Sequence, residues 1–151
     1  MLNNKMTLAG KNTLLMYGAL FSALAALVHF GCIVFGGDWY RFLGAGEQMA
    51  VLAEQGHWYP TTITLVIALI LTIWSLYALS GARVIAKLPL LRLGLCVISF
   101  VYLLRGTIFF LLMPMFPGNS ATFWFVSSSI CLIIGACYAV GTYQSWQSLR
   151  Y

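Results

Sequence analysis

The chain has 151 residues, of which 62% are apolar and 7% are charged, and its formal net charge is +5. So few charged side chains cannot cover the surface of a soluble domain, so the composition excludes that class and indicates an integral membrane protein. The length leaves room for about four spans of roughly twenty residues. We therefore predict an all-α, antiparallel bundle of four transmembrane helices, with residues 1–151 as a single domain.

Long apolar runs predict where the spans lie. The second run begins with Pro60 in its first turn, a position that tolerates proline, and the third is expected to be one unbroken helix that ends before Pro114. Between the first two runs, residues 46–55 predict a short helix at the outer interface. The four spans are expected at about 13–35, 59–79, 90–113 and 122–143.

The cations predict the orientation, because Lys and Arg beside short loops are retained on the cytoplasmic side. This rule makes both termini cytoplasmic and the segment between the first two spans external, with Arg41 and all three acids. The charge therefore reports topology and gives no reason to expect a nucleic-acid partner. The cytoplasmic cations are Lys5, Lys11, Arg83, Lys87, Arg92 and Arg150, and the acids are Asp38, Glu47 and Glu54.

Each span also carries a stripe of small or polar side chains at alternating spacings of three and four residues. Such stripes let helices approach closely in lipid, so we expect them to face one another inside the bundle. The cysteines also lie within apolar runs and form no Cys-x-x-Cys pair, so we expect packing residues and no cofactor or metal site. They are Cys32, Cys96, Cys131 and Cys137.

Arg105 is the residue that packing explains least. It lies inside the third span about eight residues from the outer end, which corresponds to a depth of roughly 12 Å. A guanidinium at that depth costs about 2.5 kcal/mol or more unless it finds a partner. Arg105 is therefore our first candidate for a ligand-binding residue. The alternative is a structural arginine that pairs with carbonyls or an acid and holds the bundle together.

His29 and Tyr102 are the next candidates. His29 lies about six residues from the outer end of the first span, at a depth of roughly 9 Å. Because neither His29 nor Arg105 tolerates hydrocarbon unpaired, we expect them to share one pocket. Tyr102 precedes Arg105 by three residues, so it should line the same pocket. The alternative for His29 is a hydrogen bond to a neighbouring hydroxyl or carbonyl.

No acid occurs within any span, so a counter-ion for Arg105 must come from the external segment. Glu47 on the short external helix is our first choice, with Asp38 and Glu54 next. A Glu47–Arg105 ion pair would fold the external segment over the bundle as a lid.

The chain contains three short motifs: DWYRFLGAGE at 38–47, WYP at 58–60 and YLLRG at 102–106. Together they resemble those of a group of small four-span proteins of the bacterial inner membrane. The resemblance implies four helices in that membrane. It implies no reaction and no catalytic residue.

Two function hypotheses remain open. A pocket with a cation, a histidine and aromatic walls suits an amphiphile such as a phospholipid, an isoprenoid phosphate or a quinone, which the protein would bind or help to move. The other hypothesis is a scaffold or accessory subunit that assembles with itself or with a larger membrane complex. A haem held by His29 and His57 is a minor alternative. No catalytic constellation appears, and neither an intramembrane acid nor a broken helix indicates an ion-coupled carrier.

Overall fold

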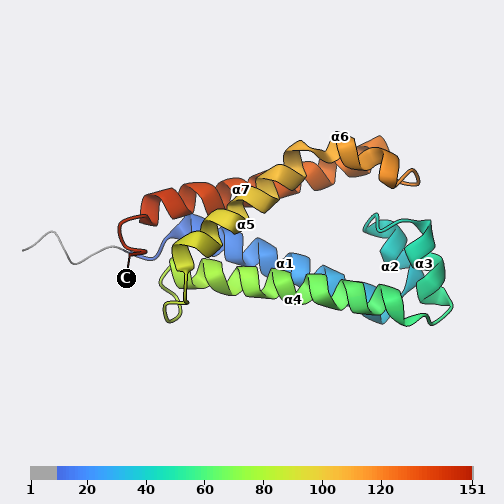
Figure 1. Ribbon diagram of the computed structural model, residues 1–151, viewed down its shortest axis with the longest axis horizontal. Coiled ribbons are helices and arrows are strands. Elements are labelled where there is room, and N and C mark those ends of the chain that lie inside the picture. The colour runs from blue at the N-terminus through green and yellow to red at the C-terminus, as the bar shows by residue number, and fades with distance from the viewer. Residues whose placement is uncertain (1–9, 151) are drawn as a thin grey trace, which may run out of the picture.

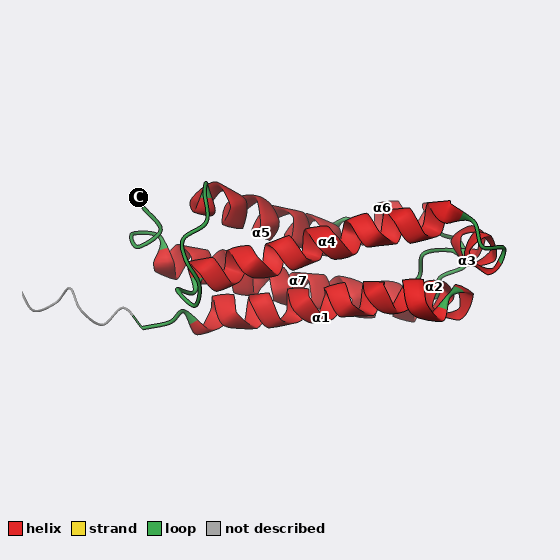
Figure 2. Ribbon diagram, turned by 90° about the horizontal axis from the view of Figure 1, so that it is seen from below, coloured by secondary structure: helices red, strands yellow, loops and turns green. Residues whose placement is uncertain are grey.

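The computed structural model describes residues 10–150, and within this range it is built from helices without strands. Their arrangement is shown in Figures 1 and 2. The helices are α1 (Thr13–Phe35), α2 (Gly37–Phe42), α3 (Glu47–Glu54), α4 (Trp58–Gly81), α5 (Leu91–Thr107), α6 (Phe109–Leu112), the 3₁₀ helix η1 (Met113–Met115) and α7 (Ala121–Ser145).

Three of these helices, α1, α4 and α7, are each long and apolar enough to cross a membrane. The pair formed by α5 with α6 and η1 meets the same criterion, although it is bent by 66°. The described chain thus has three to four candidate spans, which is consistent with a helical membrane bundle. The predicted first span coincides with α1, and the predicted second and fourth spans lie within α4 and α7.

Side-chain caps explain two of the helix starts. The Asn12 side chain accepts a hydrogen bond from the backbone N–H of Leu15 at 2.9 Å, and the Ser120 hydroxyl accepts one from the N–H of Phe123 at 3.1 Å. Each cap satisfies one of the amides that the first turn of a helix leaves without a partner. The caps therefore fix where α1 and α7 begin.

The long helices pack as two pairs, α1 with α4 and α5 with α7, and α1 also contacts α7. Neighbouring helices run antiparallel, so α1 and α7 bring the two termini of the described chain to one end of the bundle (Figure 1). There Asn12 Nδ2 donates to the carbonyl of Gly141 at 3.2 Å and to Ser145 Oγ at 2.9 Å. We call this the terminal end, and the opposite one the α2–α3 end.

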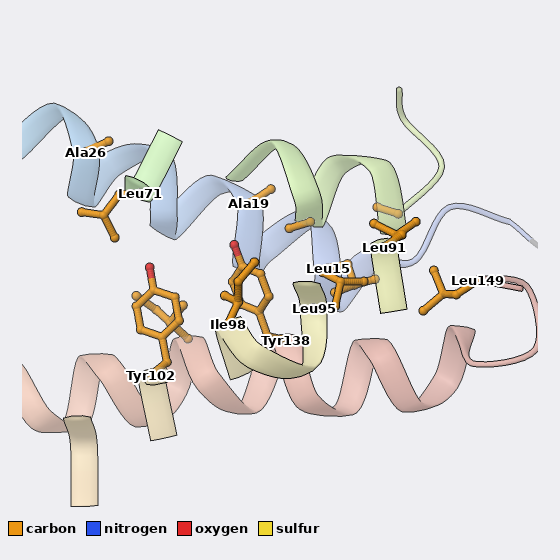
Figure 3. Close-up of a cluster of buried hydrophobic side chains, with 13 residues drawn as sticks. Leu15, Ala19, Ala26, Leu71, Leu91, Leu95, Ile98, Tyr102, Tyr138 and Leu149 are labelled. Carbon is orange, nitrogen blue, oxygen red and sulfur yellow. The ribbon is translucent and has the colours of Figure 1, made fainter. Parts of the chain in front are cut away.

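The main core lies in the half of the bundle nearer the terminal end. Leu15, Leu95 and Tyr138 are fully buried there and come from three different helices (Figure 3). Contacts between α4 and the α5–α7 pair are few compared with those within the pairs. The two pairs are therefore joined mainly through this core and through the contact of α1 with α7.

Small residues bring α5 and α7 together, as the stripes of the sequence predict. A Cβ placed on Gly106 would lie 3.0 Å from the carbonyl oxygen of Ser128, and one on Gly135 would lie 3.1 Å from the backbone nitrogen of Leu103. Real side chains rarely tolerate such distances to backbone. The two helices therefore touch backbone to backbone at two points, both within one turn of Arg105 on α5.

The prediction of an unbroken third span is wrong, because the helix breaks at Ile108. The Thr107 hydroxyl donates to the carbonyls of Leu103 at 2.9 Å and Leu104 at 3.1 Å, and such side-chain bonds bend helices by competing for backbone carbonyls. Gly106, a weak helix former, precedes it. The expectation that this chain has no broken helix is corrected with it.

The segment between α1 and α4 contains two short helices. The short helix predicted at residues 46–55 is confirmed as α3, but α2 was not predicted. Gly36, at φ 76°, lets the chain turn sharply out of α1 into α2. Tyr40 and Ala50 are buried against Cys32 of α1, which fixes this helix pair on the end of the bundle. Figure 1 shows α2 and α3 between the ends of α4 and α6.

Candidate functional site

A cavity of about 340 Å³ lies between the two helix pairs at the α2–α3 end. Helices α1 and α4 form one side, α5, α6 and α7 form the other, and α2 and α3 close the end. The Asn119 side chain donates to the carbonyl of Gly44 at 2.9 Å and so ties this cap to the chain just before α7. The lining residues that bear on function are His29, Tyr40, Thr64, Arg105, Phe116 and Trp124.

Arg105 reaches the cavity from the last turn of α5, and every partner recorded for its guanidinium comes from α7. Its Nη1 and Nη2 donate to the hydroxyls of Ser128 and Ser127, each at 3.4 Å. Its Cζ lies 5.3 Å from the centre of the Trp124 ring, within cation–π range. Within residues 10–150, no carboxylate lies within 4 Å of it. The charge is thus oriented by neutral groups and has no counter-ion.

The predicted Glu47–Arg105 ion pair is wrong, because Glu47 pairs with Arg41. The guanidinium of Arg41 donates from Nε and Nη2 to both Glu47 oxygens, at 2.9 Å and 2.7 Å. It also contacts Asp38 at 3.3 Å and Glu54 at 2.5 Å. The α2 backbone places Arg41 among all three acids, which sequence spacing did not reveal. None of these acids therefore remains for Arg105.

This ion network lies outside the long helices and shifts the ionisation of its members. The hydrogen bonds from Arg41 hold the pKa of Glu47 below its ordinary value. The bonds to Glu47 and Glu54 raise the pKa of Arg41. The network therefore fastens α3 to α2 when its carboxylates are ionised.

His29 lines the same cavity as Arg105, as the matched depths in the sequence suggested. Its Nδ1 lies 2.7 Å from the carbonyl oxygen of Ala25, one turn earlier in α1. Because a carbonyl can only accept, Nδ1 carries the hydrogen, and Nε2 is the ring nitrogen left to accept a hydrogen bond. The alternative, in which His29 bonds a neighbouring carbonyl, therefore holds for Nδ1. Nε2 remains available to a ligand.

Tyr102 does not line the cavity, which corrects its predicted place. It lies one turn closer to the terminal end than Arg105, where its hydroxyl contacts Ser22 Oγ at 2.9 Å. Tyr138 contacts the same oxygen at 2.9 Å, and its hydroxyl also donates to the Trp74 carbonyl at 2.9 Å. In Figure 3 both tyrosine hydroxyls point toward α1. Tyr102 therefore belongs to a polar layer beneath the cavity.

Two groups at the site were not predicted. Tyr40 on α2 is buried and lines the cavity, and its hydroxyl faces the side chain of Thr64. Ser127 and Ser128 of α7 both turn their hydroxyls toward Arg105. The signal that could have revealed them is the run of three serines at 127–129 in an otherwise apolar span.

His57 remains apart from His29. It is exposed at the start of α4, where its Nδ1 accepts a bond from the backbone N–H of Tyr59 at 3.2 Å, and it does not line the cavity. The structure therefore does not bring these two histidines together as a haem-binding pair.

No protein-family model matches the chain, and neither a curated protein nor a solved structure is significantly similar to it. The resemblance of its three motifs to small four-span proteins therefore stays a prediction. The cavity is therefore the main structural guide to function.

Proposed function

We propose that the cavity binds the anionic head group of an amphiphile, and that the protein holds or helps to move this ligand in the outer leaflet of a bacterial inner membrane. The observation that carries the proposal is Arg105. It is a membrane-embedded cation whose nearest partners are neutral, while Arg41 engages all three acids. A half-buried charge with no counter-ion among the described residues is costly in a membrane, and an anionic ligand removes that cost.

The lining of the cavity suits a head group joined to a hydrocarbon tail. The polar groups are the Arg105 guanidinium, which can bind a phosphate through two parallel hydrogen bonds, the Tyr40 hydroxyl and His29 Nε2. Ile63 and Ile67 of α4 and Leu112 of α6 are apolar lining residues. The head group would therefore bind Arg105, and the tail would lie among these apolar side chains and continue into the lipid.

The charge of Arg105 favours some ligands over others. A phospholipid or an isoprenoid phosphate supplies an anion, whereas a quinone supplies only carbonyl acceptors for Tyr40 and leaves the arginine charge unneutralised. We therefore rank phosphate-bearing amphiphiles above quinones. Both transport and simple binding would use this site to bind the head group.

Mass spectrometry of lipids retained by the protein, purified in mild detergent, tests the proposal. We expect one class of phosphate-bearing lipid to be retained by the natural protein, and its occupancy to fall about ten-fold or more in Arg105→Gln, since bonds to a charged group contribute about 1.5–3 kcal/mol. Arg105→Lys should retain part of it. Lys11→Gln is the matched control, because it removes a cation that lies outside the cavity and away from the α2–α3 ion network.

Two other outcomes would count against the proposal. Equal retention by the natural protein and Arg105→Gln would overturn the proposal. A stable protein partner that co-purifies, with assembly unaffected by Arg105→Gln, would instead support the accessory-subunit hypothesis.

A further inference from the structure

A second hollow is separate from the Arg105 cavity and shares no lining residue with it. It is an open groove of about 550 Å³ between α5 and α7 in the half nearer the terminal end. Its lining comes from these two helices and from Trp146, which directly follows α7, so it opens away from α1 and α4. The lining residues are Cys96, Ser99, Phe100, Leu103, Ala139, Thr142, Tyr143 and Trp146.

The shape of the groove follows from the exposure of its lining. Phe100 of α5 and Tyr143 of α7 are 63% and 83% exposed, so they form its two rims. Ser99 and Thr142 are buried and form the floor, together with the half-buried Ala139. An apolar trough with aromatic rims on a lipid-facing surface has the form needed to hold one hydrocarbon chain.

Arg92 stands at the end of this groove nearest the terminal end. Its Cζ lies 4.4 Å from the centre of the Trp146 ring, and its Nη2 donates to the Trp146 carbonyl at 2.5 Å. Its Nε is buried and has no hydrogen-bond partner within the described residues. Thr142 Oγ1, on the groove floor, is also buried without a partner. The groove thus joins an apolar trough to two polar groups with unused hydrogen-bonding capacity.

Charge identifies the occupant. The terminal end carries the described cations Lys11, Arg83, Lys87, Arg92 and Arg150, and all three acids lie at the opposite end. A cationic end attracts the anionic head groups of an adjoining leaflet at about 1 kcal/mol per residue. We infer that one anionic phospholipid binds here, with an acyl chain in the α5–α7 groove and its phosphate on Arg92. On the orientation proposed above, this lipid comes from the cytoplasmic leaflet.

Native mass spectrometry with added lipid tests the inference, with dioleoyl phosphatidylglycerol as the anionic probe and dioleoyl phosphatidylcholine as the zwitterionic one. We expect the natural protein to prefer the anionic probe. Arg92→Gln should weaken its binding roughly ten-fold, because a charged hydrogen-bond donor is lost. Ala139→Leu, which fills the groove and keeps the arginine, should weaken both probes, and this second variant covers the case in which Arg92→Gln fails to fold.

Lys11→Gln is the matched control, since it removes a cation from the same end but outside the groove and should change binding little. The inference is overturned if both probes bind equally, if Arg92→Gln or Ala139→Leu binds as the natural protein does, or if Lys11→Gln weakens binding as much as Arg92→Gln. Arg105→Gln separates the two sites: it should lower the occupancy of the cavity ligand about ten-fold or more and leave this phospholipid in place.

Discussion

Among individual residues, Ser22 forms hydrogen bonds whose direction is fixed, because its hydroxyl lies between two tyrosine hydroxyls. Tyr138 gives its single hydroxyl hydrogen to the Trp74 carbonyl. Ser22 must therefore donate to Tyr138, and Tyr102 must donate to Ser22. The bonds thus run in one direction, from α5 through α1 and α7 to α4, and this layer links all four long helices beneath the cavity.

This direction predicts an unequal effect of two substitutions. Ser22→Ala leaves the Tyr102 hydroxyl without its acceptor in the core and should lower the free energy of unfolding by about 1–2 kcal/mol. Tyr102→Phe removes only the first donor and leaves Ser22 bonded to Tyr138, so it should cost less. Thermal unfolding in detergent measures both. Ser129→Ala, at an exposed serine, is the control, and a larger loss in Tyr102→Phe than in Ser22→Ala would contradict the assigned direction.

Glu47 makes the fastening of α3 dependent on pH. Since Arg41 holds the pKa of Glu47 below its ordinary value of 4.5, the bond stabilises the folded segment above that pH and is lost as the pH falls through the lowered value. We expect the hydrogen-exchange protection of α3, relative to that of α1, to fall below about pH 4.5. Mass spectrometry of exchanged peptides, corrected for intrinsic rates, measures it.

Two variants check this assignment. Glu47→Gln should lower the protection of α3 at neutral pH and reduce its change with pH. Asp38→Asn should do neither, because Asp38 is 93% exposed and contacts Arg41 only at 3.3 Å. Identical behaviour of Glu47→Gln and the natural protein would show that the network does not hold α3.

Among the helices, α5 and α7 depend most on close backbone contact. Gly106→Ala places a methyl group 3.0 Å from the Ser128 carbonyl and 2.6 Å from Leu132 Cγ, so the helices must separate. Overpacking of this kind costs about 1–3 kcal/mol, which thermal unfolding would show. It should also displace Arg105 from its serines and lower lipid retention. Gly118→Ala, where nothing lies within 4 Å, is the control, and equal stability of the two variants would contradict the close contact.

The helices show which structural features the sequence could predict. Spans such as α1 follow from apolar length, which does not depend on neighbours, and its cap Asn12 is local too. The break at Ile108 depends on how the Thr107 hydroxyl competes for backbone carbonyls, which apolar length does not report. Helix α2 is only six residues long and depends on a sharp turn at Gly36 and on burial against α1.

In the candidate site, too, the features that depend only on position along a helix could be predicted, and those that depend on tertiary packing could not. The depth of His29 and Arg105 along two helices could be counted from the sequence, and the structure brings both to one cavity. The partner of Glu47 could not be deduced, because it depends on how α2 turns Arg41 toward the acids. Tyr102 was misplaced because a spacing of three residues fixes the side of a helix but also moves one turn along it, here from the cavity into the core.

Across the entire chain, the two ends of the bundle differ in both packing and charge. The terminal end is closed by the main core and carries most of the described cations, and the α2–α3 end contains the cavity, the acids, Arg41 and Arg105. A bundle that is firmly joined at one end can admit a ligand at the other without losing its fold. On the predicted orientation, this asymmetry places the two proposed ligands in different leaflets.

The orientation can be tested independently of any ligand. Because cations beside short loops stay in the cytoplasm, a green fluorescent protein fused to the C-terminus should fluoresce, whereas alkaline phosphatase fused there should be inactive. Alkaline phosphatase fused after Gly56, in the connection between α3 and α4, should be active, since this enzyme requires the oxidising periplasm. The reverse pattern would place the cavity in the cytoplasmic leaflet and the α5–α7 groove in the outer one, so the two lipid proposals would exchange leaflets while their binding chemistry stayed the same.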